Sequence, residues 1–318
     1  MDKLVIVAKL LVTFGLLTGV FLSTELLDLK AALLRADYAL LVLTVALYFT
    51  AYLVGGIRWW GIGGALGYTE TIGFFVRLFF ISGFFSQFLV GGGYGGDVYR
   101  IWALGRKTGN MLKSFSTVFI DRASGLIGAL LVVVLLVPVY WFEFPDHIEL
   151  LFGISMVCAG GVGFFAVLAI MGRRRRGDAA NFIATGGLRN KLLEVSRDVA
   201  TGFLSWPSTV IHMGWSSIAL LLNILAIAAI GAALDLEIGF AAYLSLGPIV
   251  FLAKSFPLSV AGWGTREVAM IYFFGLTGVD AGSALAMSIL SGVLVFVASS
   301  AGGVLWFAKG YSTPQATI

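Results

Sequence analysis

Apolar segments long enough to cross a bilayer constrain the fold of this chain more than any other feature. A membrane-spanning helix needs about 20 mostly apolar residues. Segments of this length are residues 4–23, 38–57, 114–137, 148–171, 209–233 and 282–308. Only 12% of the residues are charged and 59% are hydrophobic, whereas about 25% of the residues in a soluble domain are charged. The sequence therefore predicts an all-α, polytopic membrane protein with about six full spans, and it contains no hydrophilic block that could form a soluble catalytic domain.

Two shorter apolar stretches, residues 72–90 and 241–256, are each followed by a glycine-rich motif. The first motif is Gly93-Tyr94-Gly95-Gly96-Asp97, and the second is Gly262-Trp263-Gly264-Thr265-Arg266-Glu267. Non-helical backbone at membrane depth is tolerated only where protein or a water-filled cavity satisfies it. A matched pair of interruptions in the two halves of a chain is typical of a transport site.

The distribution of lysine and arginine predicts the orientation, because short cytoplasmic loops carry an excess of these residues. The segment 172–208 begins with four arginines and is expected in the cytoplasm, whereas the segment 138–147 has acidic residues only and is expected outside. The rule predicts that both termini lie in the cytoplasm, and the protein is expected in the cytoplasmic (inner) membrane. Further markers of the cytoplasmic side are Lys3, Lys9, Arg58, Arg106, Lys107, Lys113 and Lys309.

A full crossing by residues 72–90 would place the basic segment that follows it outside the cell. The conflict disappears if 72–90 and 98–112 form a re-entrant hairpin that enters from the cytoplasm. By the same reasoning 241–256 and 266–276 form a hairpin that enters from outside. The two motifs then lie at the ends of opposed hairpins that meet near the middle of the bilayer.

This arrangement predicts one domain built as an inverted repeat. The domain covers 1–318, its halves cover about 1–137 and 148–308, and a cytoplasmic connector covers 172–208. Apolar and charged residues in the connector alternate as in an amphipathic helix, which fits either a packed connector or a helix that senses lipid.

The residues at the two hairpin ends are suited to binding an anion. Glycine allows another group to approach the backbone closely, and free amides at the start of a helix bind phosphate or carboxylate. Arg100 and Arg266 lie within one turn of these ends and add positive charge. The alternative is a tight turn that only closes each hairpin.

Asp121 and Arg122 are ionisable residues inside a predicted span, where such residues usually mark a pathway or an ion pair. Adjacent residues point about 100° apart on a helix, so each is expected to pair elsewhere. Arg122 is expected to pair with Asp97 or Glu267, and Asp121 with Arg100 or Arg266. Lys254 has a similar position beside the second motif. The alternative is that Asp121 and Arg122 lie at the membrane interface. The predicted substrate-binding residues are Gly93, Tyr94, Gly95, Gly96, Asp97, Arg100, Asp121, Arg122, Lys254, Gly262, Trp263, Gly264, Thr265, Arg266 and Glu267.

The sequence indicates no catalytic residue, cofactor, metal site or nucleic-acid partner. Residues 91–96 match G-x-G-x-x-G, but they follow a membrane helix rather than the strand of a dinucleotide-binding fold. The two histidines, His147 and His212, are far apart, and Cys158 is the only cysteine. Trp59, like four other tryptophans near predicted helix ends, is expected at the membrane interface.

The chain resembles the lysylphosphatidylglycerol synthase transmembrane-domain family over its whole length. The resemblance rests on the stretch from Phe85 through Asp97 and Arg100, on Asp121-Arg122-x-x-Gly125, and on the segment 257–267. Members often have Glu-Arg where this chain has Asp121-Arg122. The family resemblance implies a flippase-like protein, and the synthase half is expected to be absent.

From these observations we expect a protein that translocates a lipid with a polar, anionic head group and is not itself an enzyme. Arg100, Arg122 and Arg266 would contact the head group, and Asp97, Asp121 and Glu267 would balance them. Two alternatives are an integral membrane enzyme acting on a lipid-linked substrate and an accessory subunit that presents lipid to a lipid-modifying synthase or glycosyltransferase. The sequence does not predict the oligomeric state.

Overall fold

The computed structural model describes residue 18 and residues 36–88, 94–174, 188–206, 208–255 and 262–308. Every regular element within these residues is a helix. The helices are α3 (Tyr38–Ala65), α4 (Ile72–Phe88), α5 (Gly95–Thr108), α6 (Met111–Leu135), α7 (Val137–Glu143), the short 3-10 helix η1 (Pro145–His147), α8 (Ile148–Arg174), α9 (Leu188–Leu204), α10 (Ser208–Ala233), α11 (Phe240–Ser255), α12 (Thr265–Gly275) and α13 (Ala281–Ala308).

In the part of the chain that the structure describes, 5 helices are long and apolar enough to cross a membrane. They are Tyr38–Ala65, Met111–Leu135, Pro145–Val167, Ser208–Ala233 and Ala281–Ala308. Five of the predicted spans are thereby confirmed as helices of sufficient length, and the predicted first span, 4–23, lies outside the described residues. The helix expected over 38–57 was predicted too short, because the structure continues it to Ala65.

Four consecutive helices occur twice with the same pattern of packing. We call α3–α6 the first repeat and α10–α13 the second repeat. Within the first repeat α3 contacts α4 and α6, and α5 contacts both α4 and α6; the corresponding helices of the second repeat make the same contacts. Between the repeats, the contact of α4 with α13 is matched by the contact of α11 with α6, and α3–α13 by α10–α6.

The second repeat is inverted with respect to the first. The helices α3 and α10 form the most extensive contact between the repeats. The amide of Asp37, just before α3, donates to the carbonyl of Ala233 at the end of α10, whereas Arg58 late in α3 contacts Ser216 early in α10. The two equivalent helices are therefore antiparallel, as an inverted repeat requires.

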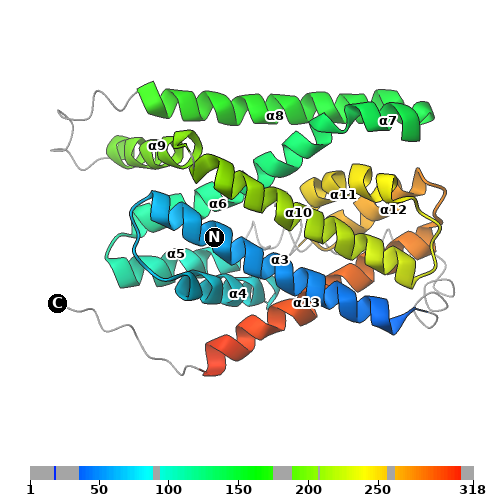
Figure 1. Cartoon of the computed structure of the whole chain (residues 1–318), viewed down its shortest axis with the longest axis horizontal. Coiled ribbons are helices and arrows are strands. Elements are labelled where there is room, and N and C mark those ends of the chain that lie inside the picture. The colour runs from blue at the N-terminus through cyan, green and yellow to red at the C-terminus, as the bar shows by residue number, and fades with distance from the viewer. Residues whose placement is uncertain are drawn as a thin grey trace.

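The helices α4 and α5 form one hairpin, and α11 and α12 form the other. In Figure 1 the first hairpin lies to the left along α3 and the second to the right. The short apolar helices α4 and α11 are thus the first helices of two oppositely directed hairpins, as the sequence predicts. The connections themselves, residues 89–93 and 256–261, lie outside the described residues.

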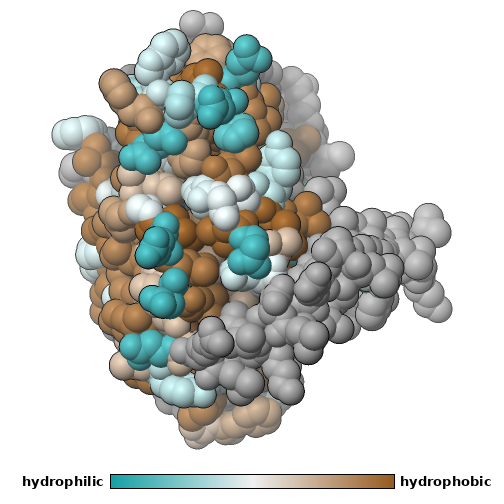
Figure 2. Space-filling view, turned by 90° about the vertical axis from the view of Figure 1, so that its right-hand side faces the viewer, coloured by the Kyte–Doolittle hydropathy of each residue, from teal (hydrophilic) through white to brown (hydrophobic). Residues whose placement is uncertain are grey.

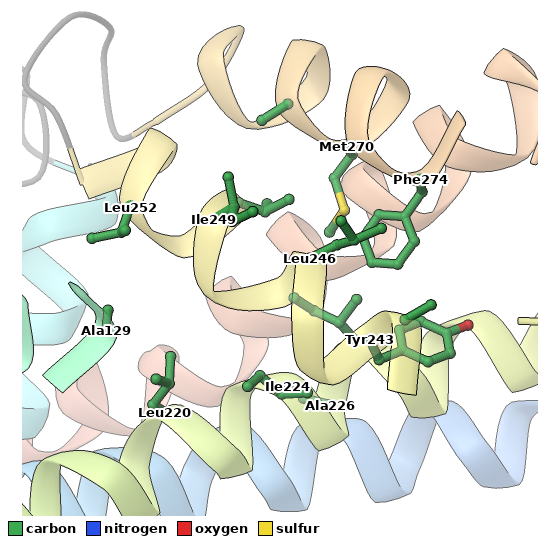
Figure 3. Close-up of a cluster of buried hydrophobic side chains, with 14 of the residues drawn as sticks. Ala129, Leu220, Ile224, Ala226, Tyr243, Leu246, Ile249, Leu252, Met270 and Phe274 are labelled. Atoms are coloured by element: carbon green, nitrogen blue, oxygen red, sulfur yellow. The ribbon is translucent and has the colours of Figure 1, made fainter. Parts of the chain in front are cut away.

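The largest hydrophobic core surrounds α11. Figure 3 shows Leu246 and Ile249 of α11 against Met270 and Phe274 of α12, with Ile224 of α10 on the other side. All five side chains are buried, with at most 5% of their surface exposed. This packing holds the second hairpin against α10 and fixes the position of the charged residues at its end.

The two ends of the bundle differ in net charge. Figure 2 shows the end where α3 and α13 begin and α10 stops, with hydrophilic side chains scattered over a mostly hydrophobic surface. The described segments at this end contain no lysine or arginine, and their acidic residues are Asp37, Glu143, Asp146, Glu149, Asp235, Glu237 and Asp280. Basic residues lie at the opposite end, where α5 ends and α6 begins: Arg106, Lys107 and Lys113.

The connector between the repeats contains the predicted amphipathic helix as α9. Val199 of α9 is buried against Ile62 of α3, Leu66 just after α3, and Ile120 of α6. The apolar face of α9 therefore packs on the first repeat, which fits the packed-connector alternative. The helix α8 lies along one edge of the bundle (Figure 1).

Candidate functional site: two charge clusters at the hairpin ends

The first charge cluster consists of Arg58, Asp97, Arg100, Asp121 and Arg122. Asp121 accepts a hydrogen bond of 2.8 Å from Arg58 Nε and another of 2.8 Å from Arg100 Nη1. Asp97 accepts one of 2.5 Å from Arg100 Nη2 and one of 2.8 Å from Arg122 Nε. Arginines and aspartates therefore alternate in one chain of charge-assisted hydrogen bonds, the strong class of hydrogen bond.

Helix geometry explains how α5 and α6 bring these residues together. Asp97 and Arg100 are three residues apart on α5 and so share one face of it. At Gly96 the backbone of α5 presses on the carbonyl of Ser82 in α4, and any β-carbon there would overlap that carbonyl. On α6, Asp121 points inward with 1% of its surface exposed, whereas the side chain of Arg122 is 53% exposed.

Aromatic rings enclose the guanidinium of Arg100. Its central carbon lies 4.9 Å from the ring centroids of both Trp59 and Phe79, a distance typical of cation–π attraction. The indole nitrogen of Trp59 donates to Thr117 Oγ1 over 3.2 Å, and Trp59 is fully buried. The prediction that Trp59 lies at the membrane interface was wrong, because the indole packs against a buried cation and donates to a neighbouring helix.

Arg58 is a member of the first charge cluster that the sequence analysis missed. It was interpreted as a basic residue that ends a span at the cytoplasmic surface, but it lies inside α3 and is 8% exposed. Besides Asp121 it contacts Ser216 Oγ of α10 over 3.1 Å. The apolar residues that follow it, such as Ile62, were the available signal that the helix continues.

The second charge cluster consists of Lys254, Arg266 and Glu267. Glu267 Oε1 accepts from Arg266 Nη2 over 2.6 Å and from Ser288 Oγ over 3.0 Å. Its other oxygen accepts from the amide of Gly264 over 2.5 Å, which caps the start of α12. Glu267 is fully buried. Its carboxylate therefore both neutralises Arg266 and satisfies a free amide at the end of the hairpin.

The glycines of the second motif are required by the backbone. Gly262 and Gly264 have φ values of +80° and +92°, in a region that side chains other than glycine rarely adopt. The turn brings Trp263 against the guanidinium of Arg266. The ring centroid of Trp263 lies 4.5 Å from the central carbon of that guanidinium. Gly262 also lies beside Lys254, which would be 3.4 Å from a β-carbon at this position. The motif thus brings the end of α11 and the start of α12 together.

A small cavity lies beside the second charge cluster, between α10, α11, α12 and α13. Lys254 and Arg266 contribute the charged part of its lining, and Asn223 and Ser291 contribute further polar groups. The Ser291 hydroxyl is 2.7 Å from that of Tyr48 on α3. Helix α3 therefore contributes to both the first charge cluster and the surroundings of the cavity. Arg58 belongs to the cluster, and Tyr48 lies beside the cavity.

The structure places most of the predicted site residues in these two clusters. The predicted pairs Asp97–Arg122 and Asp121–Arg100 are confirmed, and Glu267 pairs with its neighbour Arg266. Asp121 is buried within α6, with 1% of its surface exposed. Tyr94 precedes α5 at its N-cap, Gly95 begins α5, and Thr265 bonds back to the carbonyl of Gly262. Gly93 lies outside the described residues.

The fold and the clusters define a class of protein: a polytopic helical membrane protein with an inverted repeat and buried charges at the ends of two opposed hairpins. The family model described as the lysylphosphatidylglycerol synthase TM region matches residues 6–303. The chain therefore belongs to this family, as its sequence motifs predict, and the family supports a role in lipid handling. A comparison with curated proteins gives no match.

Proposed function

We propose that this protein translocates a lipid with a polar, anionic head group across the cytoplasmic membrane. The main observation behind this proposal is that cations outnumber carboxylates at both hairpin ends. The first charge cluster has three arginines and two aspartates, and the second has Lys254 and Arg266 against Glu267. Each cluster therefore has one cation more than it has carboxylates, which favours an anion.

The depth of these charges supports translocation. Ionisable residues in a membrane span usually mark a pathway when they face the interior. The side chain of Arg122 forms an ion pair with Asp97 and is half-exposed. It is therefore the residue of the first charge cluster that is best placed to meet a head group, while the acyl chains remain in the bilayer.

The charge difference between the two ends of the bundle supports an orientation. The basic end would lie in the cytoplasm and the acidic end outside, following the excess of lysine and arginine in cytoplasmic loops. Both termini would then be cytoplasmic. The α4–α5 hairpin would enter from the cytoplasm and the α11–α12 hairpin from outside, so a head group would pass from one hairpin end to the other.

A test uses the purified full chain in liposomes with a trace of fluorescent phosphatidylglycerol. A membrane-impermeant reductant bleaches only the label in the outer leaflet. Protein-containing vesicles are expected to expose inner-leaflet label faster than empty vesicles and than vesicles with Arg122→Ala. Equal rates would overturn the proposal. Chemically modified lipid recovered from the same vesicles would instead favour the membrane enzyme, and activity that needs an added synthase or glycosyltransferase would favour the accessory subunit.

A further inference from the structure

The inverted repeat assigns an equivalent in the second repeat to each residue that α5 and α6 contribute to the first charge cluster. Helices α3, α5 and α6 begin at Tyr38, Gly95 and Met111, and their equivalents begin 170 residues later (281 − 111 for α6 and α13). The helices α4 and α11 begin 168 residues apart (240 − 72). An offset of 170 pairs residues of α5 and α6 as follows: Asp97 with Glu267, Arg100 with Met270, Asp121 with Ser291, and Arg122 with Gly292.

Both repeats have an acidic residue at the hairpin end, Asp97 in the first and Glu267 in the second. The charged residues Arg100, Asp121 and Arg122 have uncharged equivalents in the second repeat. In the first repeat the carboxylate of Asp121 is held between Arg58 and Arg100. At the equivalent positions the second repeat has Ser291 in place of this carboxylate and Met270 in place of Arg100. These shorter or neutral side chains line the small cavity beside the second charge cluster, and Figure 3 shows Met270 pointing toward α11.

The cavity nevertheless retains cations. Lys254 has no carboxylate within ion-pair distance among the described residues, and its ammonium lies 5.1 Å from the ring centroid of Phe251. Arg266 shares the cavity wall, and its guanidinium lies so close to Gly292 that a β-carbon there would clash with it. Lys254 is only partly exposed, and a partly desolvated cation is stabilised by an anion beside it. Glu267 neutralises Arg266, so Lys254 is the cation of the cavity lining that has no carboxylate partner among the described residues.

We propose that the cavity binds an anionic oxygen of a phosphate group, which takes the place that Asp121 has in the first repeat. The cavity has room for about one water-sized group, enough for one oxygen. Lys254 and Arg266 supply the charge, as both side chains commonly do for phosphate. Asn223 donates one amide proton to the carbonyl of Ala219 and retains a second donor. The phosphate is that of a lipid head group. This step rests on the proposed translocation and identifies a phosphodiester as the part of the substrate that is recognised.

The test measures lipid retention by native mass spectrometry of the full chain in detergent. The probes are phosphatidylglycerol, diacylglycerol, which lacks the phosphate, and inorganic phosphate. Wild type is expected to retain phosphatidylglycerol and not diacylglycerol. Ser291→Asp restores an internal carboxylate next to Lys254 and is expected to weaken retention about tenfold or more, as expected for a charged hydrogen bond. Lys254→Met removes the cation and is expected to give a similar loss.

The control is Lys191→Met, which removes an exposed cation of α9 and is expected to leave retention unchanged. Equal retention by wild type, Ser291→Asp and Lys254→Met would overturn the proposal, as would an equal loss with Lys191→Met. Binding of inorganic phosphate without retention of phosphatidylglycerol would overturn the lipid as the source. If Ser291→Asp does not fold, Lys254→Met decides.

The same variants separate the cavity from the proposed translocation. If wild type retains phosphatidylglycerol, the two variants do not, and wild type moves no lipid in vesicles, the cavity assignment holds and translocation fails. If both variants bind and translocate like wild type, translocation holds and the cavity assignment fails.

Discussion

Asp97 is the third residue of α5 and Glu267 is the third residue of α12, so the two repeats place an acid at the same helical position. Their surroundings differ. Asp97 is one link in a chain of five charged side chains that crosses from α3 to α5 and α6. Glu267 is neutralised by its neighbour Arg266 and accepts further hydrogen bonds from Ser288 and from the amide of Gly264.

The difference suggests separate tasks for two hairpins of common design. In the first repeat the buried charges satisfy one another, and only Arg122 extends to a more exposed position. In the second repeat a cavity lies where the first has Arg100 and Asp121, and Lys254 beside it has no carboxylate among the described residues. The two repeats thus share one backbone pattern. The first repeat contains the internal carboxylate of Asp121, whereas the second is left to bind an anion from outside the protein.

The largest expected effect comes from giving the first repeat the neutral residue of the second. Asp121→Ser leaves Arg58 and Arg100 without their shared acceptor, and breaking a buried pair costs about 3–5 kcal/mol. We expect the thermal midpoint to fall by about 10 °C. A thiol-reactive dye measures it, because Cys158 is buried and is the only cysteine.

The matched control for this change is the double variant Asp121→Ser/Arg100→Met, which copies Ser291 and Met270. The double variant removes Arg100, one of the two arginines that lose their carboxylate partner in Asp121→Ser. It is expected to recover part of the lost stability. If Asp121→Ser alone is as stable as wild type, the first charge cluster is not held together by this carboxylate, and the contrast between the repeats fails.

Arg122→Ala tests whether the exposed member of the first charge cluster acts in transport rather than in folding. Asp97 keeps its bond to Arg100, and the lost pair is half-exposed, so the destabilisation should be about 1 kcal/mol or less. Lipid translocation in liposomes is expected to be lost. Arg106→Ala, which removes an exposed cation at the basic end of α5, serves as the control and should translocate normally. Loss of the folded protein instead of its activity would make Arg122 a structural residue.

A cross-link tests whether the two hairpin ends meet. In a Cys158→Ser background, cysteines at Tyr94 and Trp263 are expected to react with a short bifunctional reagent, because the hairpins approach the centre of the bundle from opposite ends (Figure 1). Phosphatidylglycerol should slow the reaction by occupying the space between them. A cysteine at Phe240, at the far end of α11, should not react with one at Tyr94. Two ends that label singly but never cross-link would rule out a shared site.

The smallest expected effect concerns the connector that joins the repeats. Burial raises the pKa of Asp198 on α9; a hydrogen bond from Ser116 opposes the shift, and the Glu194 carboxylate adds to it. A carboxyl whose pKa is higher in the folded state binds its proton more readily there, so its contribution to stability falls as the pH rises through that range. Asp198→Asn should therefore raise the thermal midpoint by about 1–3 °C at pH 7. The difference should vanish at a pH where Asp198 is protonated in both states, and a gain that persists there would exclude this cause.

The sequence alone predicted five long apolar helices and the two short apolar helices of the hairpins, because these follow from local properties. Segment length and hydropathy predict which helices can span, and the backbone conformation at Gly262 and Gly264 explains why the second motif needs glycine. The positions of Asp121 and Arg122 inside a span likewise predicted ion pairs with Arg100 and Asp97, both of which the structure contains.

Only the tertiary structure decided which side chains share a site. Arg58 meets Asp121 from 63 positions away and Ser216 from 158 positions away, and no local pattern contains such a pairing. Trp59 is buried for the same reason, since its neighbours belong to α5 and α6. The cavity beside Lys254 depends on the packing of four helices, so whether it is filled is set by side-chain volume and charge across the bundle rather than by any single stretch of sequence.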